Sequence, residues 1–327
     1  MPRSRSSQIS LVDTPYYHCV SRCVRRSFLC GVDSYSGRSF EHRRDWVEKR
    51  LLHLASVYAI DICAYAVMNN HVHVVLCVDN CLADSWSLDE VLQHWHLVHK
   101  GTLLSQKYFS NDDISETEMI SLSETAEVYR QRLYDISWFM RDLNEYIARE
   151  ANKEDECSGR FWEGRFKSQA LLDEAAVLSC MAYVDLNPIR ANINKTIITS
   201  RHTSIFYRTQ AFIRSKIQPS LLMPFVGSFK ESKIRGLAYE LRDYCELLES
   251  TRRYIRKDRA ENKGILSSSI LKSLGLSQKQ WMTLTTEFEK HFCYAAGGEK
   301  MMQRFKHHTQ HKRIRGMCNA KRLLETG

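Results

Sequence analysis

The chain has 327 residues, of which 43% are hydrophobic and 26% are charged, and its formal net charge is +9. This length and composition indicate a globular protein of one large or two smaller domains, and the positive charge favours an anionic partner, with nucleic acid the first candidate. Eleven cysteines without a Cys-x-x-Cys pair, no apolar run of membrane-spanning length and no signal peptide predict a cytoplasmic protein without membrane contact.

The first part of the chain predicts a strand, a helix and a hairpin. The residues after Pro15 have strand character over Tyr16–Arg22, and apolar residues at helical spacing follow in Phe40–Tyr58. Alternating apolar residues then predict two strands, Ala59–Val67 and His71–Val78. The turn between these strands contains two asparagines, which tolerate left-handed backbone angles, so we expect an antiparallel hairpin.

The segment 80–134 differs in composition from the residues before it. A helix is expected over Val91–His99, but Ser110–Glu127 is acidic, rich in serine and poor in large apolar residues. We therefore interpret 80–134 as an acidic, partly mobile insertion, in which a helix resumes near Val128.

Two helices and a strand follow the insertion. Asp135–Asn152 has the apolar stripe of an amphipathic helix, and Phe166–Leu172 is a fourth strand. Asp173 is a good N-cap for a helix over Glu174–Leu186, which Pro188 ends.

This order of elements predicts an α+β fold, the ferredoxin-like β-α-β-β-α-β sandwich with helices on one face of an antiparallel sheet. Beyond about residue 205 the pattern becomes mostly helical. We therefore expect a domain over 1–205 and a helical, basic C-terminal region over 206–327. Helices are expected there over Ile234–Arg256 and Ser267–Leu274, and a third begins at Ser277.

Two histidines stand two positions apart in the third strand. His71 and His73 point to the same face because side chains alternate along a strand, and two imidazoles can form half of a metal site. Tyr183 and Asn187 share a helix face four residues apart. Together they offer three neutral ligands beside a phenol, an arrangement that suits covalent catalysis on a phosphodiester. A hydrogen-bonded histidine pair, a core tyrosine and a helix-capping asparagine explain the same residues structurally.

Three separated motifs resemble those of the IS200/IS605-like tyrosine transposases, in particular the REP-associated branch of these HUH endonucleases. The motifs are Asn69–His73, Gly159–Phe166 and Tyr183–Ala191. The resemblance covers roughly residues 14–205, apart from the insertion. It implies that Tyr183 is the nucleophile that forms a 5′-phosphotyrosine link to single-stranded or hairpin DNA.

The resemblance also implies a cofactor. Asn187 would be the third protein ligand, with His71 and His73, of a Mg²⁺ or Mn²⁺ ion. Mg²⁺ prefers oxygen ligands whereas imidazoles suit Mn²⁺, so the identity of the metal stays open. The family includes monomers and homodimers, and both remain possible for this chain.

Basic and aromatic residues near the motifs are candidates for DNA contacts, because aromatic rings stack on unpaired bases and arginines pair with phosphates. The candidates are Arg22, Arg25, Arg160, Phe161, Trp162, Arg165, Lys167 and Arg190. The alternative for Phe161 and Trp162 is that they plug the sandwich while the neighbouring arginines are merely solvated.

The C-terminal region is interpreted as a DNA-binding accessory. The turn Leu274–Ser277 lies between two short helices and suggests a helix-turn-helix. The stretch Arg304–Arg322 is strongly basic, and we expect a disordered cationic tail there rather than a metal site built on its histidines.

We expect a transposase or single-strand DNA endonuclease that acts at REP-like hairpins on nucleoid DNA. A catalytically silent nucleic-acid-binding protein on the same fold is the alternative, and a metal-dependent phosphodiesterase that uses water is a weaker one. Tyr146 is the competing nucleophile, although its position in the apolar stripe favours a core role.

Overall fold

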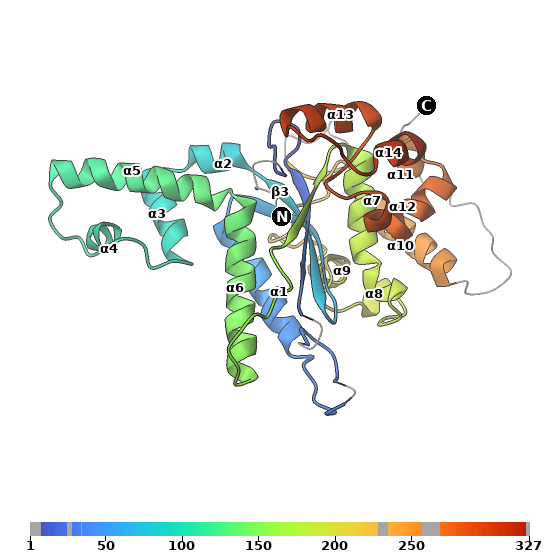
Figure 1. The fold of residues 1–327 in the computed structure, drawn as a ribbon, viewed down its shortest axis with the longest axis horizontal. Coiled ribbons are helices and arrows are strands. Elements are labelled where there is room, and N and C mark those ends of the chain that lie inside the picture. Colours follow the sequence, from blue (N-terminus) through green and yellow to red (C-terminus); the bar gives the residue numbers. More distant parts are fainter. Residues whose placement is uncertain (1–7, 25–27, 34, 228–234, 257–268, 325–327) are drawn as a thin grey trace.

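A five-stranded sheet forms the centre of the computed structural model, which describes residues 8–24, 28–33, 35–227, 235–256 and 269–324 (Figure 1). The strands are β1 (Tyr16–Arg22), β2 (Ile60–Val67), β3 (His71–Val78), β4 (Lys167–Leu171) and β5 (Ala295–Ala296). Their order is β2-β3-β1-β4-β5, and β5 runs parallel to β4 whereas the other neighbours are antiparallel. The order of the first four strands confirms the predicted ferredoxin-like fold.

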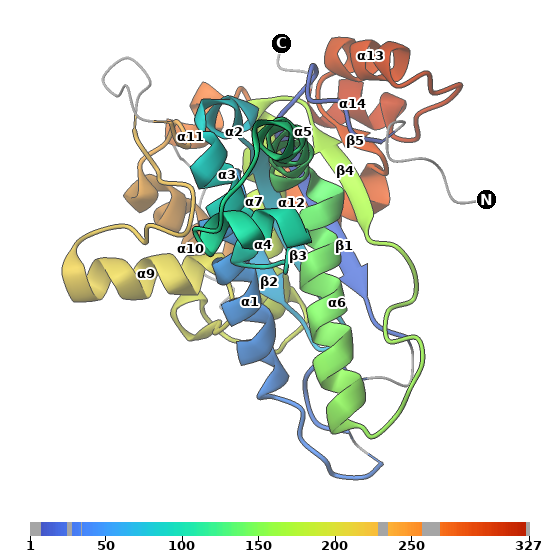
Figure 2. The ribbon, with the colours of Figure 1, turned by 90° about the vertical axis from the view of Figure 1, so that its left-hand side faces the viewer.

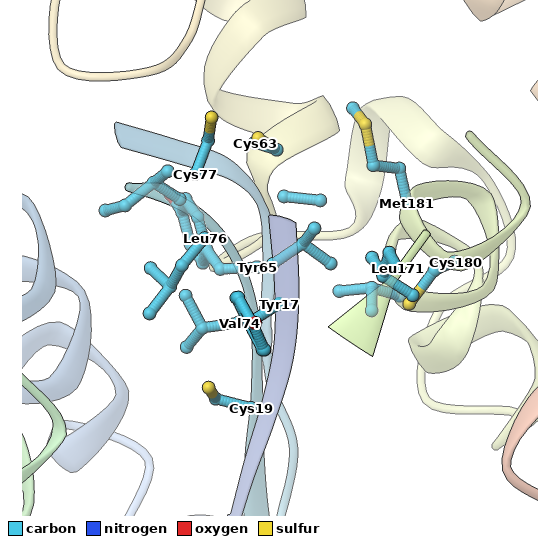
Figure 3. Packing of buried hydrophobic residues seen from close by; sticks show 14 of the residues in the cluster. Tyr17, Cys19, Cys63, Tyr65, Val74, Leu76, Cys77, Leu171, Cys180 and Met181 are labelled. Atoms are coloured by element: carbon cyan, nitrogen blue, oxygen red, sulfur yellow. The ribbon is translucent and has the colours of Figure 1, made fainter. Parts of the chain in front are cut away.

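Two crossover helices cover one face of this sheet. They are α1 (Arg43–Val57), which connects β1 to β2, and α6 (Ile136–Glu154), which leads back to β4. The two helices pack against each other and lie side by side in Figure 2. Buried side chains of the central strands fill the space beneath them, among them Tyr17, Val74 and Leu76 (Figure 3).

The opposite face is also covered. Helix α7 (Glu174–Asp185) packs on β2 and β3, and α12 (Gln278–His291) packs on α7. Met181 of α7 lies on this side of the sheet in Figure 3. Asp173 caps α7 as predicted, since its carboxylate accepts a hydrogen bond from the backbone N–H of Ala176 at 2.8 Å. The sheet therefore has two covered faces, and the second buries part of the candidate site.

The segment 80–134 forms a helical arm that projects from the sheet (Figure 1). Its helices are α2 (Asn80–Ser85), α3 (Leu88–His96), α4 (Leu103–Phe109) and α5 (Glu116–Leu133). The prediction that a helix resumes only near Val128 is wrong. Ser115 and Glu118 form a capping box that starts α5, and Leu122, Ala126, Tyr129 and Leu133 bury one side of the helix. The acidic residues simply occupy its other sides.

The remaining elements are also helical. They are α8 (Asn187–Arg190), a 3₁₀ turn (Ile197–Thr199), α9 (Ser204–Ser215), α10 (Leu241–Arg256), α11 (Ser269–Ser273), α13 (Glu299–His308) and α14 (Met317–Leu323). The first residues of the predicted helices 234–256 and 267–274 lie outside the described residues. Among the described residues, no helix has the length and apolar character needed to cross a membrane.

The basic C-terminal stretch is folded, so the expectation of a disordered tail is wrong. Apolar residues hold it in place: Met302 and Phe305 of α13 are buried, and the ring of His311 stacks on Tyr294. Earlier in the C-terminal region, the helix predicted to start at Ser277 is α12, whose N-cap is Ser277 in a capping box with Gln280. This helix buries Trp281 and packs on α7, and the helix-turn-helix stays a prediction.

Candidate functional site

The two histidines of the third strand lie on the sheet face that α7 covers. In the register of the sheet, His73 is opposite Val20 and His71 is opposite Arg22. Directly opposed residues of antiparallel strands project to the same face, so Arg22 lies beside His71. His18, two residues before Val20 on β1, projects to this face as well. The sheet therefore presents three histidines on one face.

His18 and His73 are in direct contact. The Nε2 atom of His18 is 2.9 Å from Nδ1 of His73, and the two rings are stacked with their centroids 5.1 Å apart. Both side chains are buried. His18 was not among the predicted site residues, and the register of β1 with β3 places it diagonally across from His73.

Tyr183 approaches these rings from α7. Its ring centroid is 5.9 Å from that of His73 and 6.3 Å from that of His18, in edge-on geometry. The side chain is 9% exposed. The structure thus brings the predicted nucleophile to the strand histidines, which lie more than a hundred residues earlier in the chain.

The C-terminal region completes the surroundings of Tyr183. The Tyr183 hydroxyl donates a hydrogen bond to Oε2 of Glu289 at 3.1 Å, and the ring of Phe288 lies 6.0 Å away. Both residues belong to α12. No sequence signal connected this helix with the site, because the contact depends entirely on tertiary packing.

Asn187 lies one turn beyond Tyr183, but the helix changes there. Helix α7 ends at Asp185, Leu186 caps it, and α8 begins at Asn187 with Pro188 in its first turn. The Asn187 side chain is buried. Its assignment as a metal ligand stays a prediction.

Arg190, a predicted DNA contact, is used largely inside the protein. Its Nη1 donates hydrogen bonds to the carbonyl oxygens of Tyr183 at 2.6 Å and Thr285 at 2.8 Å. Its guanidinium carbon lies 3.9 Å from the centroid of the Tyr183 ring, a cation–π contact. Burial lowers the pKa of Arg190 to about 10, so the side chain remains a cation at neutral pH.

Burial sets the charge states of the site. It lowers the pKa of His71 to about 4, with the Arg22 guanidinium contributing, and it also lowers the pKa values of His18 and His73. Burial and the neighbouring Glu289 carboxylate raise the pKa of Tyr183. At neutral pH the imidazoles are therefore neutral, which is the form that binds metals, and the phenol keeps its proton.

The residues present fit a divalent metal ion. The Nε2 atom of His73 is buried and has no hydrogen-bond partner among the described residues, so its environment leaves a polar atom unsatisfied. Nδ1 of His71 is 2.6 Å from the side-chain oxygen of Asn70. When Nδ1 donates in this bond, Nε2 of His71 is left with a lone pair for a ligand, as in most metal-binding histidines.

The aromatic residues of the loop before β4 favour the plug interpretation. Phe161 is 3% exposed and belongs to the hydrophobic core. The indole N–H of Trp162 donates a hydrogen bond to the carbonyl oxygen of Asn144 at 2.8 Å. Phe161 in this position has no exposed face on which a base could stack.

The predicted basic contacts have different surroundings. Arg22 and Lys167 are exposed, and the register places both on the face of the histidines. Arg160 and Arg165 are exposed in the loop before β4, where Nε of Arg160 donates to the carbonyl oxygen of Trp162. Arg25 lies outside the described residues.

Tyr146 does not reach this site. It belongs to α6, on the other face of the sheet, and it is 38% exposed beside the guanidinium of Arg50. The expectation of a core role is wrong, because the residue lies at the edge of the apolar stripe. Its distance from the histidine face leaves Tyr183 as the nucleophile candidate.

Comparison with protein-family models and with curated proteins finds no match. Among solved structures, the chain is similar to a REP-associated tyrosine transposase bound to a REP hairpin, at 11% sequence identity and a TM-score of 0.38. The alignment covers 72% of this chain and 98% of that chain. The ferredoxin-like fold is defined by the strand order and register described above.

Proposed function

We propose that this protein is a metal-dependent DNA endonuclease and strand transferase, of the transposase type, that forms a 5′-phosphotyrosine intermediate on Tyr183. The observation that carries this proposal is the position of the Tyr183 ring, edge-on to His73 and His18 and in contact with the cation Arg190. The proposed substrate is single-stranded DNA at REP-like hairpins, on the DNA of the nucleoid.

The convergence of two of the three motifs supports the proposal. The turn before β3 is held to the end of β1 by a hydrogen bond from the Cys23 N–H to the Asn70 carbonyl oxygen, at 3.0 Å. The loop before β4 is held to the same strand end, since the Val24 N–H donates to Phe161 and the Glu163 N–H donates to Arg22. Segments that resemble one family's motifs thus meet at one end of one sheet.

The protein would hold a Mg²⁺ or Mn²⁺ ion through His71, His73 and Asn187. When bound, the ion would supply positive charge to the oxygens of the scissile phosphate. The Asn70 side chain orients His71 for this role, and burial keeps both imidazoles neutral.

The chemistry balances without a nucleotide cofactor. The Tyr183 oxygen forms a bond to phosphorus and loses its proton, the bond from phosphorus to the 3′ oxygen breaks, and that oxygen leaves as a hydroxyl after gaining a proton. The 5′-phosphotyrosine retains the energy of the broken phosphodiester bond. Attack of another 3′ hydroxyl on the phosphotyrosine phosphorus forms a new phosphodiester bond and releases Tyr183. The DNA strand is thereby rejoined.

Exposed cations on the histidine face suit the sugar-phosphate backbone. Arg22 and Lys167 lie at the same end of the sheet as His71. A guanidinium can bind a phosphate through two hydrogen bonds, and both side chains would hold single-stranded DNA near Tyr183.

The test is covalent capture of DNA. Full-length protein is incubated with an end-labelled REP-type hairpin oligonucleotide and Mn²⁺, and adducts are separated under denaturing conditions. We expect a labelled protein band that Tyr183→Phe abolishes. Tyr146→Phe is the matched control, because it removes a hydroxyl from the opposite face of the sheet, and it should leave the adduct unchanged. An adduct that survives Tyr183→Phe contradicts the proposal.

One observation favours a second candidate, a catalytically silent DNA-binding protein. Tyr183 is 9% exposed and its hydroxyl is already bonded to Glu289, so a phosphate must displace this contact before attack. The silent protein would bind the hairpin with strong salt dependence but form no adduct with any metal. A hydrolytic phosphodiesterase would instead cleave the oligonucleotide without an adduct.

A further inference from the structure

A cluster of three donor side chains lies around Tyr183, and its two histidines are buried whereas its glutamate is exposed. One donor atom from each of His18, His73 and Glu289 lies within 4.8 Å of the other two. They come from β1, β3 and α12, so distant parts of the chain converge on one point. Only His73 belongs to the predicted ligand set.

The contact between the two imidazoles is compatible with two arrangements. A hydrogen-bonded histidine pair explains the 2.9 Å between Nε2 of His18 and Nδ1 of His73. Two nitrogens bound to one ion are also close to this separation, because metal–nitrogen bonds of about 2.1 Å at right angles put them ~3 Å apart. In both arrangements the buried Nε2 atom of His73 has no hydrogen-bond partner among the described residues.

The surroundings of His18 favour metal binding. Its Nδ1 atom is 3.3 Å from the side-chain oxygen of Gln169, itself buried on β4. Donation from Nδ1 to this oxygen leaves the lone pair of Nε2 directed at His73. Ligating histidines are usually held in this way, with the second ring nitrogen bonded to a carbonyl or carboxylate oxygen.

Charge provides the argument for Glu289. The predicted ligands His71, His73 and Asn187 are all neutral, and the guanidinium of Arg190 is close to Tyr183. A divalent cation bound by neutral ligands alone would add uncompensated positive charge to a partly buried site. The Glu289 carboxylate supplies a negative oxygen, the ligand type that Mg²⁺ and Mn²⁺ prefer.

We propose that His18 and Glu289 bind the divalent cation together with His73, so that α12 of the C-terminal region supplies the acidic ligand of the site. This inference rests on the proposed function, since it specifies the ligands of the same metal. It makes the C-terminal region part of the metal site rather than a separate DNA-binding accessory.

Direct Mn²⁺ binding tests the inference without an activity assay. Full-length protein is titrated with Mn²⁺, and the electron paramagnetic resonance signal of free Mn²⁺ gives the Kd. We expect Glu289→Gln and His18→Gln each to raise the Kd by at least about tenfold, as expected for loss of a ligand. Thermal melting of each variant checks that it is folded.

Glu287→Gln is the matched control for Glu289→Gln. It makes the same change two residues earlier on α12, where the carboxylate pairs with Lys290 and His291 instead of facing the site. We expect it to bind Mn²⁺ like the wild type. Glu289→Asp keeps a carboxylate and should retain more Mn²⁺ affinity than Glu289→Gln.

The results separate this inference from the proposed function. If the wild type binds Mn²⁺ and forms the DNA adduct while folded Glu289→Gln binds Mn²⁺ equally well, the inference is wrong and the proposed function stands. A loss of affinity in Asn187→Ala but not in Glu289→Gln also overturns it, in favour of the amide ligand. If the wild type binds no Mn²⁺, the metal requirement of the proposed function fails as well.

Discussion

The guanidinium carbon of Arg190 lies 3.9 Å from the centroid of the Tyr183 ring, while the same side chain bonds to the carbonyl oxygen of Tyr183. One residue therefore fixes both the backbone and the ring of the proposed nucleophile. Arginine can do this because its planar guanidinium stacks on a ring while its N–H groups donate in plane, which the ammonium of lysine cannot match.

Replacing Arg190 with lysine should slow adduct formation. The variant keeps the charge but loses the stacked geometry and the paired carbonyl contacts, so we expect a fall in adduct rate of about tenfold or more and a loss of stability of about 1–3 kcal/mol. Single-turnover adduct assays and urea denaturation measure the two effects. Arg149→Lys, at an exposed ion pair on α6, is the control. An unchanged rate would show that Arg190 does not position Tyr183.

Removing the Asn70 side chain should weaken metal binding through His71. The Asn70 oxygen is 2.6 Å from Nδ1 of His71, and loss of such an orienting bond typically costs about 10–100-fold in metal affinity. Mn²⁺ titration of Asn70→Ala measures this, with Asn80→Ala on the arm as the control. Wild-type affinity in Asn70→Ala would mean that His71 does not bind the ion.

The capping box of α5 should stabilise the first turns of this helix. Ser115→Ala removes the side chain that caps the helix, so we expect a local loss of about 1 kcal/mol. Amide hydrogen exchange should show faster exchange in the first turns of α5 than in the wild type. Ser121→Ala, exposed in the same helix, should leave exchange there unchanged. Rapid exchange of the whole arm in the wild type would support the prediction of a mobile insertion.

Phe161→Ala distinguishes a core residue from a base-stacking one. Because the ring is buried, we expect a loss of stability of about 3–5 kcal/mol, measured by urea denaturation. DNA affinity should be unchanged under conditions where the variant is folded. Tyr35→Ala, at a fully exposed aromatic residue, should leave stability unchanged. Lost affinity at unchanged stability would instead assign Phe161 to the DNA.

The free energy of unfolding should depend on pH because Glu154 is ionised in the folded protein. Burial tends to raise the pKa of Glu154, but its hydrogen bond and ion pair with the buried Arg43 outweigh this and lower the pKa below the ordinary 4.5. Such a group stabilises the folded state above about pH 4.5 and loses this contribution as the pH falls through its folded-state pKa.

Glu154→Gln should therefore destabilise the protein at neutral pH, by an amount on the order of 1 kcal/mol because the carboxylate is partly exposed. The difference from the wild type should shrink as the pH falls below 4.5, as followed by urea denaturation across pH. Glu124→Gln is the control on the arm. A difference that stays constant with pH would show that the Glu154 charge is not involved.

Local signals were sufficient for much of the fold. Strand character after Pro15 predicted β1 and alternation predicted β3, both with their observed bounds. Capping residues predicted the starts of α7 at Asp173 and α12 at Ser277. These features depend on neighbours within a few residues. The arm was underestimated because its apolar residues are few, yet their spacing is sufficient to bury one side of α5.

Only some residues of the candidate site could be predicted from the sequence. His71, His73 and Tyr183 were found because spacing and resemblance point to them. His18 could be found only once β1 is paired with β3 in the folded sheet. Glu289 had no local signal, since its contact with Tyr183 exists only after α12 packs on α7.

The hydrogen bond from Tyr183 to Glu289 can form only after both residues have been synthesised. The two residues are 106 positions apart in the chain. At a synthesis rate of about 5–20 residues per second, Tyr183 leaves the ribosome roughly 5–20 s before Glu289 does. During that interval the sheet, the histidines and the phenol can already be assembled without the helix that covers them. A newly made chain thus passes through a stage in which its proposed nucleophile is uncovered, and the arrival of α12 ends that stage.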